Sequence, residues 1–510
     1  MATTRPHHTF TALFLAVTAA PLAAQNLSLD KVGGSLGGPT TLPILGQPNE
    51  FYALAVDLWE EPTPLPAYGV TMDIPLRLVD LSFAIPGWVG TTNGTGAATP
   101  AVVIPDDPFF AQFTYSFQVL GGGGPWRTSN LVRVTPQHTG TWLEPLNQPP
   151  VPIAGGTTAV APNKELLFVG GSGPVAQRYK SRTEEWEAAG VTFGVGLFSQ
   201  STGLPDGRVL FTGGLDLTTG QTTAAAAVYD PVAQTTTTLS MASPRAGHGA
   251  SLMGNGKVLI TGGLSALDLA NPLSLFTGLL GSTEIFDPAT NTFAPGPNML
   301  EARALHTSTT LTNGQVLVAG GISLLPILNL PTVSATAYRF NPNTNSFGLP
   351  SFFSGGRFLH SAAPTSDGKV LLVGGLNLDF TTFLTTGNIA DLVLTTRTDC
   401  QLFTPSFLGG FGTFATVNGM QVGRAGAAVA PLPSGGALIV GGFQLTIDVP
   451  TSTFGFVPTE TCDRFAQGPN SIAPTGSMAA PRLFPVAVNL PDATVLVVGG
   501  GPTATEIYQY

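Results

Sequence analysis

Short apolar runs that end in a glycine pair repeat along the chain, and they predict β-strands. Residues 255–263 read NGKVLITGG, a turn followed by four apolar residues and two glycines. Asn-Gly and Asp-Gly favour tight hairpin turns, and a short apolar run predicts a strand buried on both faces. The glycine pair predicts a point where the backbone leaves the strand with no room for a side chain. Versions of this string lie at 163–171, 206–214, 255–263, 313–321, 367–375, 434–442 and 492–500.

The glycine pairs begin 43 to 67 residues apart. A repeat of this length that carries strands, not helices, predicts the blades of a β-propeller. We therefore expect an all-β protein with one blade for each of the seven strings, and we assign a structural role to the paired glycines. They are Gly170, Gly171, Gly213, Gly214, Gly262, Gly263, Gly320, Gly321, Gly374, Gly375, Gly441, Gly442, Gly499 and Gly500.

Each repeat predicts further strands around the buried one. A strand of small residues precedes the turn, as in GASLM at 249–253, and suits the innermost position where blades converge. A third strand ends in an aromatic residue and a fourth carries a bulky one, such as Phe286 and Phe293. The chain stops after the last third strand, so we expect its fourth strand upstream, at 140–145 around Trp142. That pairing would close the ring and remove an open sheet edge.

Residues 140–510 resemble the kelch repeat of β-propellers. The resemblance rests on the glycine pairs, on the two columns of bulky residues, and on an arginine that opens the first strand of a blade. These arginines are Arg245, Arg303, Arg357, Arg424 and Arg482. The resemblance implies a seven-bladed kelch-like propeller, although the first two repeats lack the arginine and the fourth-strand residue is often Phe, Leu or Ile.

The N-terminal part of the chain predicts two further segments. An apolar run follows Arg5 and ends in small residues, which is the layout of a secretory signal peptide over 1–24, cut near Ala24. Residues 25–136 alternate apolar and polar positions, which predicts a small β-sandwich. Parts of this segment look similar to a module of secreted bacterial proteins. We therefore expect a secreted, cell-surface or periplasmic protein.

Composition and charge narrow the range of partners. The chain of 510 residues has a formal net charge of −10 and only 10% charged residues. Because phosphate backbones are bound by basic surfaces, we expect no nucleic acid partner. No stretch is long and apolar enough to span a membrane, and we expect a monomer. Cys400 and Cys462 occupy matching repeat positions. The sequence leaves open whether they form a disulfide, which requires a close approach of their Cα atoms.

Histidines at matching repeat positions are the first candidates for chemistry. His248, His306 and His360 could bind a metal as a ring, or each could be a structural repeat position that bonds its own blade. Galactose oxidase-like copper radical oxidases use a kelch propeller, but their set of two His, two Tyr and a Tyr-linked Cys is not recognisable here. The repeat arginines could bind an anionic ligand, and we favour a structural role for them. We expect no catalytic residue, metal or cofactor.

Four long, apolar loops follow glycine pairs and leave the same face of the predicted ring. They cover 264–282, 322–335, 376–398 and 443–460. Variable loops on one face of a propeller commonly form a binding surface; alternatively, these loops pack on one another or on 25–136. The candidate residues of this face are Leu275, Phe276, Leu325, Phe380, Phe383, Phe454 and Phe456.

These patterns lead to one functional expectation and one alternative. We expect a secreted, non-enzymatic scaffold that binds a protein or glycan ligand through the apolar loop face. The alternative is an extracellular galactose oxidase-like or other carbohydrate-active enzyme on the same propeller.

Overall fold

The structure is a computed structural model that describes most of the chain in two compact units. It covers residues 26–122, 125–145, 147–149, 157–160, 165–169, 175–192, 196–216, 219–267, 272–325, 330–380, 382–386, 393–406, 411–448, 453–490, 493–501 and 505–510. The predicted signal peptide, Gly170 and Gly171 lie outside these residues. The first unit is Met1–Asp30, Leu42–Ala101 and Tyr115–Val132, and the second is Lys31–Thr41, Val102–Thr114 and Arg133–Tyr510. No helix in the covered ranges has the length and apolarity needed to cross a membrane.

The second unit consists mainly of antiparallel four-stranded sheets with one shared topology. In the described residues the four strands of each sheet pair in chain order, with one exception in the last sheet. The sheets are β14 (Thr157–Val160), β15 (Glu165–Val169), β16 (Val175–Lys180), β17 (Glu185–Thr192); β18 (Gln200–Gly203), β19 (Val209–Thr212), β22 (Ala225–Asp230), β23 (Thr235–Ser240); β24 (Gly249–Leu252), β25 (Val258–Thr261), β26 (Thr283–Asp287), β27 (Thr292–Pro295); β29 (Thr307–Thr310), β30 (Val316–Ala319), β33 (Thr336–Asn341), β34 (Ser346–Phe347), with β35 (Ser351–Phe352) also on β33; β36 (Ser361–Pro364), β37 (Val370–Val373), β40 (Cys400–Thr404), β41 (Thr413–Val417); β42 (Ala428–Pro431), β43 (Ala437–Val440), β46 (Cys462–Ala466), β47 (Ser471–Thr475); and β48 (Val486–Asn489), β49 (Val495–Val498), β50 (Glu506–Gln509), β13 (Thr141–Leu143).

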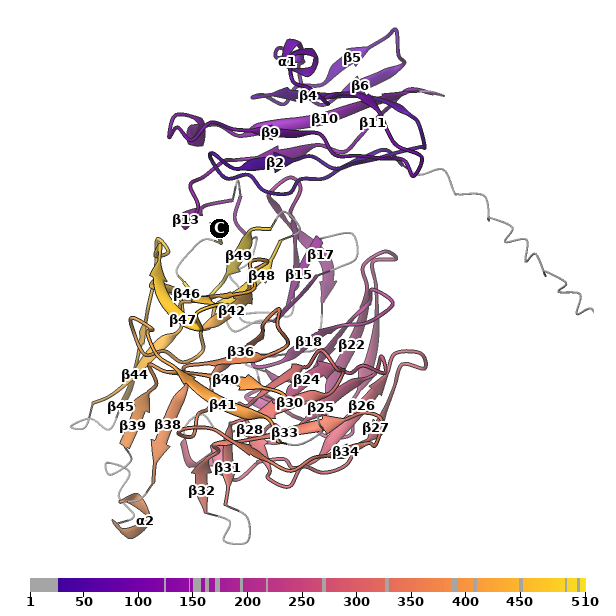
Figure 1. The fold of residues 1–510 in the computed structure, drawn as a ribbon. Helices are drawn as coiled ribbons and strands as arrows, with labels where there is room; N and C mark the ends of the chain where they lie inside the picture. The colour runs from indigo at the N-terminus through magenta and orange to yellow at the C-terminus, as the bar shows by residue number, and fades with distance from the viewer. Residues whose placement is uncertain are drawn as a thin grey trace, which may run out of the picture. The chain divides into compact units, whose positions relative to one another are not determined.

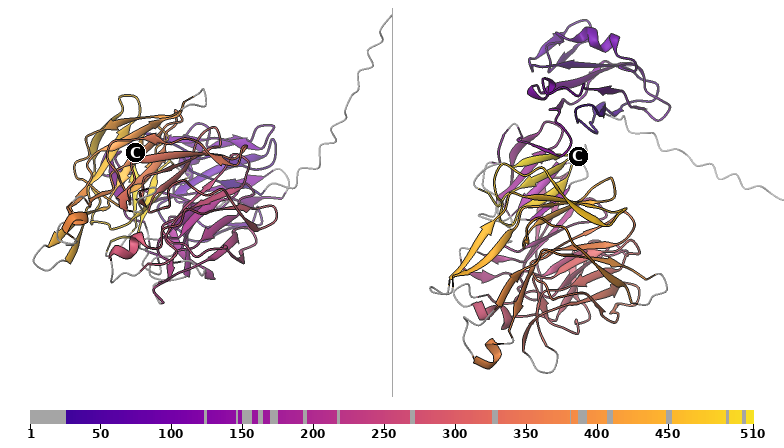
Figure 2. Two further views of the ribbon diagram at one scale, coloured as in Figure 1. Left: turned by 90° about the horizontal axis from the view of Figure 1, so that it is seen from below. Right: turned by 60° about the vertical axis from the view of Figure 1, so that its left-hand side comes forward.

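Consecutive sheets contact each other through their first strands. β14 contacts β18, and the same contact continues through β24, β29, β36, β42 and β48 in turn. β48 also contacts β14, so the first and the last sheet are neighbours. Figure 1 shows β48 and β49 beside β15 and β17, and Figure 2 shows the sheets from two further sides.

Hairpins and short helices occupy the long segments that follow the glycine pairs. They are β20 (Leu215–Asp216) with β21 (Gln221–Thr222), η2 (Pro272–Phe276), β31 (Ile322–Leu324) with β32 (Pro331–Val333) and β28 (Arg303–Ala304), β38 (Leu376–Asp379) with β39 (Val393–Thr396), α2 (Phe383–Thr386), and β44 (Phe443–Asp448) with β45 (Thr453–Pro458). The hairpins β31–β32, β38–β39 and β44–β45 extend from the same side of the unit, at the bottom of Figure 1.

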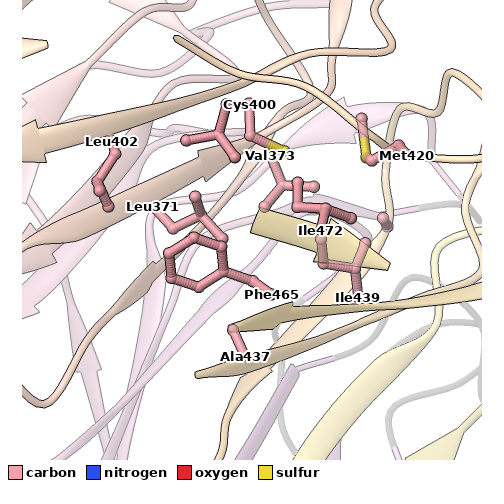
Figure 3. Packing of buried hydrophobic residues seen from close by; sticks show 11 residues of the cluster. Leu371, Val373, Cys400, Leu402, Met420, Ala437, Ile439, Phe465 and Ile472 are labelled. Atoms are coloured by element: carbon pink, nitrogen blue, oxygen red, sulfur yellow. The ribbon is translucent and has the colours of Figure 1, made fainter. Parts of the chain in front are cut away.

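The second strand in chain order forms the buried centre of the six sheets in which its side chains are described. All four residues of β25 are buried, and the same holds for β19, β30, β37, β43 and β49. This confirms the prediction of strands buried on both faces. Figure 3 shows how two neighbouring sheets interlock, with Leu371 and Leu402 of one near Ile439 and Phe465 of the next. Each side chain buried in this way contributes about 1.5–3 kcal/mol.

The last sheet takes its fourth strand from upstream in the chain. β13 pairs antiparallel with β50, which places Trp142 opposite Tyr508. The two rings lie 5.1 Å apart between centroids, and the Trp142 Nε1–H donates to the carbonyl of Gly476 at 2.7 Å. This strand covers an edge of β50 that would otherwise expose unpaired backbone groups.

The glycine pairs join neighbouring sheets. Gly374 and Gly375 have φ values of +56° and +101°, a conformation that favours glycine. The Gly375 N–H donates to the carbonyl of Arg424 in the next sheet at 2.8 Å. A Cβ atom on Gly374 would overlap that same carbonyl oxygen. The equivalent N–H to carbonyl bonds run from Gly214 to Arg245, from Gly263 to Arg303, from Gly321 to Arg357 and from Gly442 to Arg482.

Each repeat arginine completes this joint with its side chain. Arg424 Nη1 donates to the carbonyl of Gly441 in its own sheet, and Nη2 donates to Asp463 at 2.7 Å. The equivalent partners are Gly262 and Glu284 for Arg245, Gly320 and Glu301 for Arg303, Gly374 and Asp399 for Arg357, and Gly499 and Glu506 for Arg482. All five arginines are 0% exposed. They hold the structure together, because removing one partner of a buried ion pair typically costs about 3–5 kcal/mol.

The strands before residue 135 form smaller sheets. β4 (Phe51–Asp57), β7 (Val89–Thr91), β10 (Tyr115–Gly122), β11 (Arg127–Thr128) and β12 (Val132–Val134) form one sheet, and β1 (Ser28–Leu29), β3 (Ile44–Leu45) and β8 (Ala97–Ala98) form another. Two-stranded pairs are β2 (Pro39–Thr41) with β9 (Ala101–Val103) and β5 (Thr63–Leu65) with β6 (Val70–Met72), and the helical segments are α1 (Val79–Ala84) and η1 (Phe110–Gln112). Trp88 and Phe117 are buried in contact, with ring centroids 5.9 Å apart.

The joint predicts a large difference between two glycine substitutions. Gly374→Ala combines the strain of a positive φ with overlap of a packed carbonyl, and we expect it to lower the free energy of unfolding by about 3 kcal/mol or more. Gly220, with φ +69° and open space around its Cα, is the control. Gly220→Ala carries only the backbone strain of about 1 kcal/mol. Urea denaturation of both variants measures the difference, and equal losses would contradict the role assigned to the joint.

Candidate functional site

The three repeat histidines lie around one cavity in the second unit. The cavity has a volume of about 230 Å³ and is lined by residues at or beside four consecutive first strands, β18, β24, β29 and β36. Its lining residues are Gln200, His248, Gly249, Ala250, His306, Thr307, Ser308, Thr309, His360 and Ala362. This described lining contains no carboxylate, lysine or arginine, so the cavity is polar and offers hydrogen bonds without a formal charge.

The glycine pairs make room for the histidine rings. A Cβ atom on Gly213 would lie 2.9 Å from Cε1 of His248 in the next sheet. The corresponding distances are 3.2 Å from Gly262 to His306 and 2.6 Å from Gly320 to His360. All three rings therefore occupy the same place in the repeat. A larger residue at the first glycine would displace them.

Each histidine forms one hydrogen bond through Nε2 with a threonine hydroxyl. His248 pairs with Thr212 at 2.8 Å, His306 with Thr261 at 2.9 Å, and His360 with Thr307 at 2.9 Å. These bonds join neighbouring sheets, which supports a structural role for the histidines. The expectation that each histidine bonds its own blade is wrong for these bonds, because the partner threonine lies in the preceding sheet. The rings contact the cavity as well as the sheet joint, so they can combine both roles.

Burial keeps these histidines neutral. Desolvation, reinforced by the charge of the nearby Arg245, lowers the pKa of His248 to about 3. Burial and the charge of Arg357 lower the pKa of His360 to about 3 as well. The pKa of His306 falls well below its usual value for the same reasons. At neutral pH the cavity wall is therefore an uncharged set of imidazoles, hydroxyls and one amide.

A ring of residues in left-handed conformation lies next to the cavity toward the long loops. Its members precede the first strands: Phe198, Gly247, Leu305, Leu359, Gly426 and Phe484, all with φ between +49° and +60°. Backbone hydrogen bonds run around it, from the Gly247 N–H to Phe198, from Leu305 to Gly247, from Leu359 to Leu305 and from Gly426 to Leu359. The rings of Phe484 and Phe198, 5.6 Å apart, complete the circuit. We call these six residues the apolar ring.

Three of the predicted loop residues belong to an apolar cluster beyond this ring. Phe276 and Phe380 are buried and meet edge to face with centroids 5.2 Å apart, and Leu275 packs against the same cluster. Leu325 is 39% exposed and Phe456 is 53% exposed. The side chains of Phe383 and Phe454 lie outside the described residues. The described loops thus pack on one another to a large extent.

Sequence reasoning missed several residues of this site. Gln200 and Thr307 line the cavity but carry no motif, and their position on first strands was the available signal. The large side chains of Leu305 and Phe484 in the apolar ring were also missed. Gly247 and Gly426 at equivalent positions could have indicated a repeated positive φ.

Comparison with known proteins finds similar solved structures, and one of them is described below. No family model and no curated protein matches the chain. A solved structure described as "Novel fungal alcohol oxidase with catalytic diversity among the AA5 family, in complex with copper" is similar, with 16% identity and a TM-score of 0.38. The match covers 62% of this chain and 75% of that chain. It agrees with an all-β fold and is too distant to transfer residue roles.

This comparison corrects the main functional expectation. We expected a non-enzymatic binding or scaffold protein, whereas the similar solved structure is that of an enzyme. The expectation of a non-enzymatic scaffold is therefore not carried further.

The described residues do not fit the copper centre that a galactose oxidase-like enzyme would need. Among the described residues no group of three or more His, Cys, Asp and Glu side chains is placed to hold a metal. The Nε2 atoms of the histidines are bonded to threonines. Cys400 and Cys462 are free, buried thiols in the sheets, where burial raises the pKa of each to about 12. We derive no chemistry through copper.

The neutral histidines predict a specific dependence of stability on pH. In the unfolded chain a histidine gains a proton below its ordinary pKa of 6.5, whereas folded His248 and His360 stay neutral down to about pH 3. Their stabilisation is thus complete above 6.5 and declines as the pH falls from there toward 3, by about 1.4 kcal/mol per pH unit for each histidine. We expect unfolding free energies to fall between pH 7 and pH 5.

Urea denaturation at these two pH values tests the origin of this decline. His306→Gln should make the pH dependence shallower, because one of the three buried histidines no longer titrates while His248 and His360 remain. A dependence that this variant retains in full would show that His306 does not contribute.

Proposed function

We propose that the second unit is a seven-bladed kelch-like β-propeller. The support is the repeated topology of its seven four-stranded sheets in the described residues. Contacts between successive first strands, including β48 with β14, support a closed circuit of sheets. The pairing of β13 with β50 supports closure by the upstream strand 140–145.

The remaining domain assignments follow the sequence. Residues 1–24 are proposed as a signal peptide, 25–136 as a β-sandwich and 140–510 as the propeller. In this proposal the protein acts outside the cytoplasm, after cleavage near Ala24. The apolar run that precedes the small residues near Ala24 supports the proposed signal peptide.

We further propose that the chain is an extracellular enzyme that acts on a small, neutral carbohydrate. The observation that carries this proposal is the histidine cavity, with its uncharged hydrogen-bonding wall of imidazoles, hydroxyls and the Gln200 amide. Sugar hydroxyls both donate and accept hydrogen bonds, which matches the inventory of this wall. A volume of about 230 Å³ restricts the bound part to a small molecule or a single sugar unit. The copper alcohol oxidase is a distant likeness and carries no part of this argument.

A substrate screen tests the proposed function. Purified mature protein is incubated with neutral mono- and oligosaccharides, and products are followed by mass spectrometry, with and without added Cu(II). We expect turnover of a neutral sugar and weaker activity on uronic acids and amino sugars, whose charges find no counter-charge in the wall.

Two glutamine variants localise the activity. Gln200→Leu removes an amide from the cavity and should lower kcat/KM about tenfold or more. Gln221→Leu, at an exposed position of β21, is the control. Turnover that is unaffected by Gln200→Leu would place the active site elsewhere, and the absence of turnover of every sugar would contradict the proposed function.

A further inference from the structure

One of the three histidine–threonine bonds differs from the other two in its position. Thr212 and Thr261, the partners of His248 and His306, lie at the ends of second strands and are 1% and 0% exposed. Thr307, the partner of His360, lies instead on the first strand β29 and lines the cavity. Two bonds are therefore sealed behind the cavity wall, and the third is part of the wall.

The repeat itself explains this difference. The residue before the glycine pair is Thr212 in one sheet and Thr261 in the next, and each hydroxyl meets the histidine of the following sheet. In the third sheet that position is Ala319, which has no hydroxyl to offer. The His360 ring occupies the same place against Gly320 as its equivalents do against their glycines. Its Nε2 is thus left to bond Thr307 on the cavity side.

We infer that Thr307 and His360 contact the substrate, in an inference that rests on the proposed function. Either atom of their 2.9 Å hydrogen bond can act as donor, according to the tautomer of the ring. In the tautomer in which the Nε2–H of His360 donates to Thr307, the threonine hydroxyl keeps its own hydrogen and one lone pair. Thr307 can then both donate to and accept from one hydroxyl group of a neutral carbohydrate, while the His360 ring lies beside it in the cavity wall. Ser308 and Thr309, adjacent on the same strand, extend this polar surface.

The cavity lining also offers small apolar surfaces. Ala250 and Ala362 line the cavity beside its polar residues. A sugar carries both hydroxyl groups and apolar C–H faces, so this lining meets both kinds of surface. The substrate class that fits is a neutral sugar with a hydroxyl directed toward Thr307.

Matched Thr→Val variants test the inference. Thr307→Val removes the hydroxyl from the cavity wall and keeps the side-chain shape. We expect it to weaken binding of a neutral monosaccharide about tenfold by calorimetry, with a melting temperature close to that of the unmodified chain, since cavity water can replace the lost partner of His360. The probes are D-glucose, D-galactose and D-mannose.

Thr261→Val is the control at the sealed position. It leaves the buried Nε2 of His306 without a partner, and we expect a melting temperature lower by a few degrees and unchanged affinity. Ala319→Thr is a second, independent variant. It offers His360 the sealed partner that the two preceding sheets offer through Thr212 and Thr261, and we expect weaker sugar binding.

The outcomes separate this inference from the proposed function. Sugar binding by the unmodified chain that persists in Thr307→Val overturns the inference alone. A Thr307→Val variant that is destabilised as much as Thr261→Val overturns it too, because Thr307 would then be only a structural partner. If the unmodified chain binds none of the three sugars, the proposed function and the inference fail together.

Discussion

The joint between a glycine pair and the arginine of the next sheet is the constraint on which the second unit depends. A four-stranded sheet of this size cannot bury its apolar faces alone, so each sheet needs two neighbours. The Gly375 N–H fixes the distance to the next sheet through the Arg424 carbonyl, and the Arg424 side chain fixes the turn of its own sheet through Gly441. The ion pair with Asp463 neutralises the buried guanidinium. Five steps between neighbouring sheets therefore reuse one short-range arrangement.

The sequence predicts this scaffold well, because its main requirements are local. A positive φ demands glycine, an all-buried strand demands an apolar run, and both appear as strings in the chain. The upstream strand around Trp142 could also be predicted, since the last repeat lacks a fourth strand. The acids that neutralise the arginines are harder to predict. Glu284 lies on the third strand of its sheet, whereas Glu301 lies two residues before Arg303 and reaches the same guanidinium position.

The site is less predictable than the scaffold, because it depends on where side chains from different sheets meet. The matching repeat positions of the histidines suggested either a metal ring or a structural repeat position. Their Nε2 atoms turn out to bond threonines from neighbouring sheets, and these partners lie 36, 45 and 53 residues away in sequence. Apolar loop residues such as Phe276 and Phe380 were candidates for an exposed face, but their rings pack against each other from two different loops. No local pattern distinguishes an apolar side chain that packs on a loop from one that faces solvent.

The departures from the repeat carry the functional information, because a perfect repeat would give every sheet the same inward surface. The apolar ring illustrates this in energetic terms. Gly247 and Gly426 adopt its positive φ without strain, whereas Leu305, Leu359, Phe198 and Phe484 adopt it at a cost of about 1–2 kcal/mol each. That strain is offset by the contacts of large side chains, which glycine cannot make. In the same way, Ala319 in place of threonine turns the His360 bond from the sheet joint toward the cavity. A site for one asymmetric ligand can thus arise among sheets of one repeated topology, through a few substitutions that leave the joints intact.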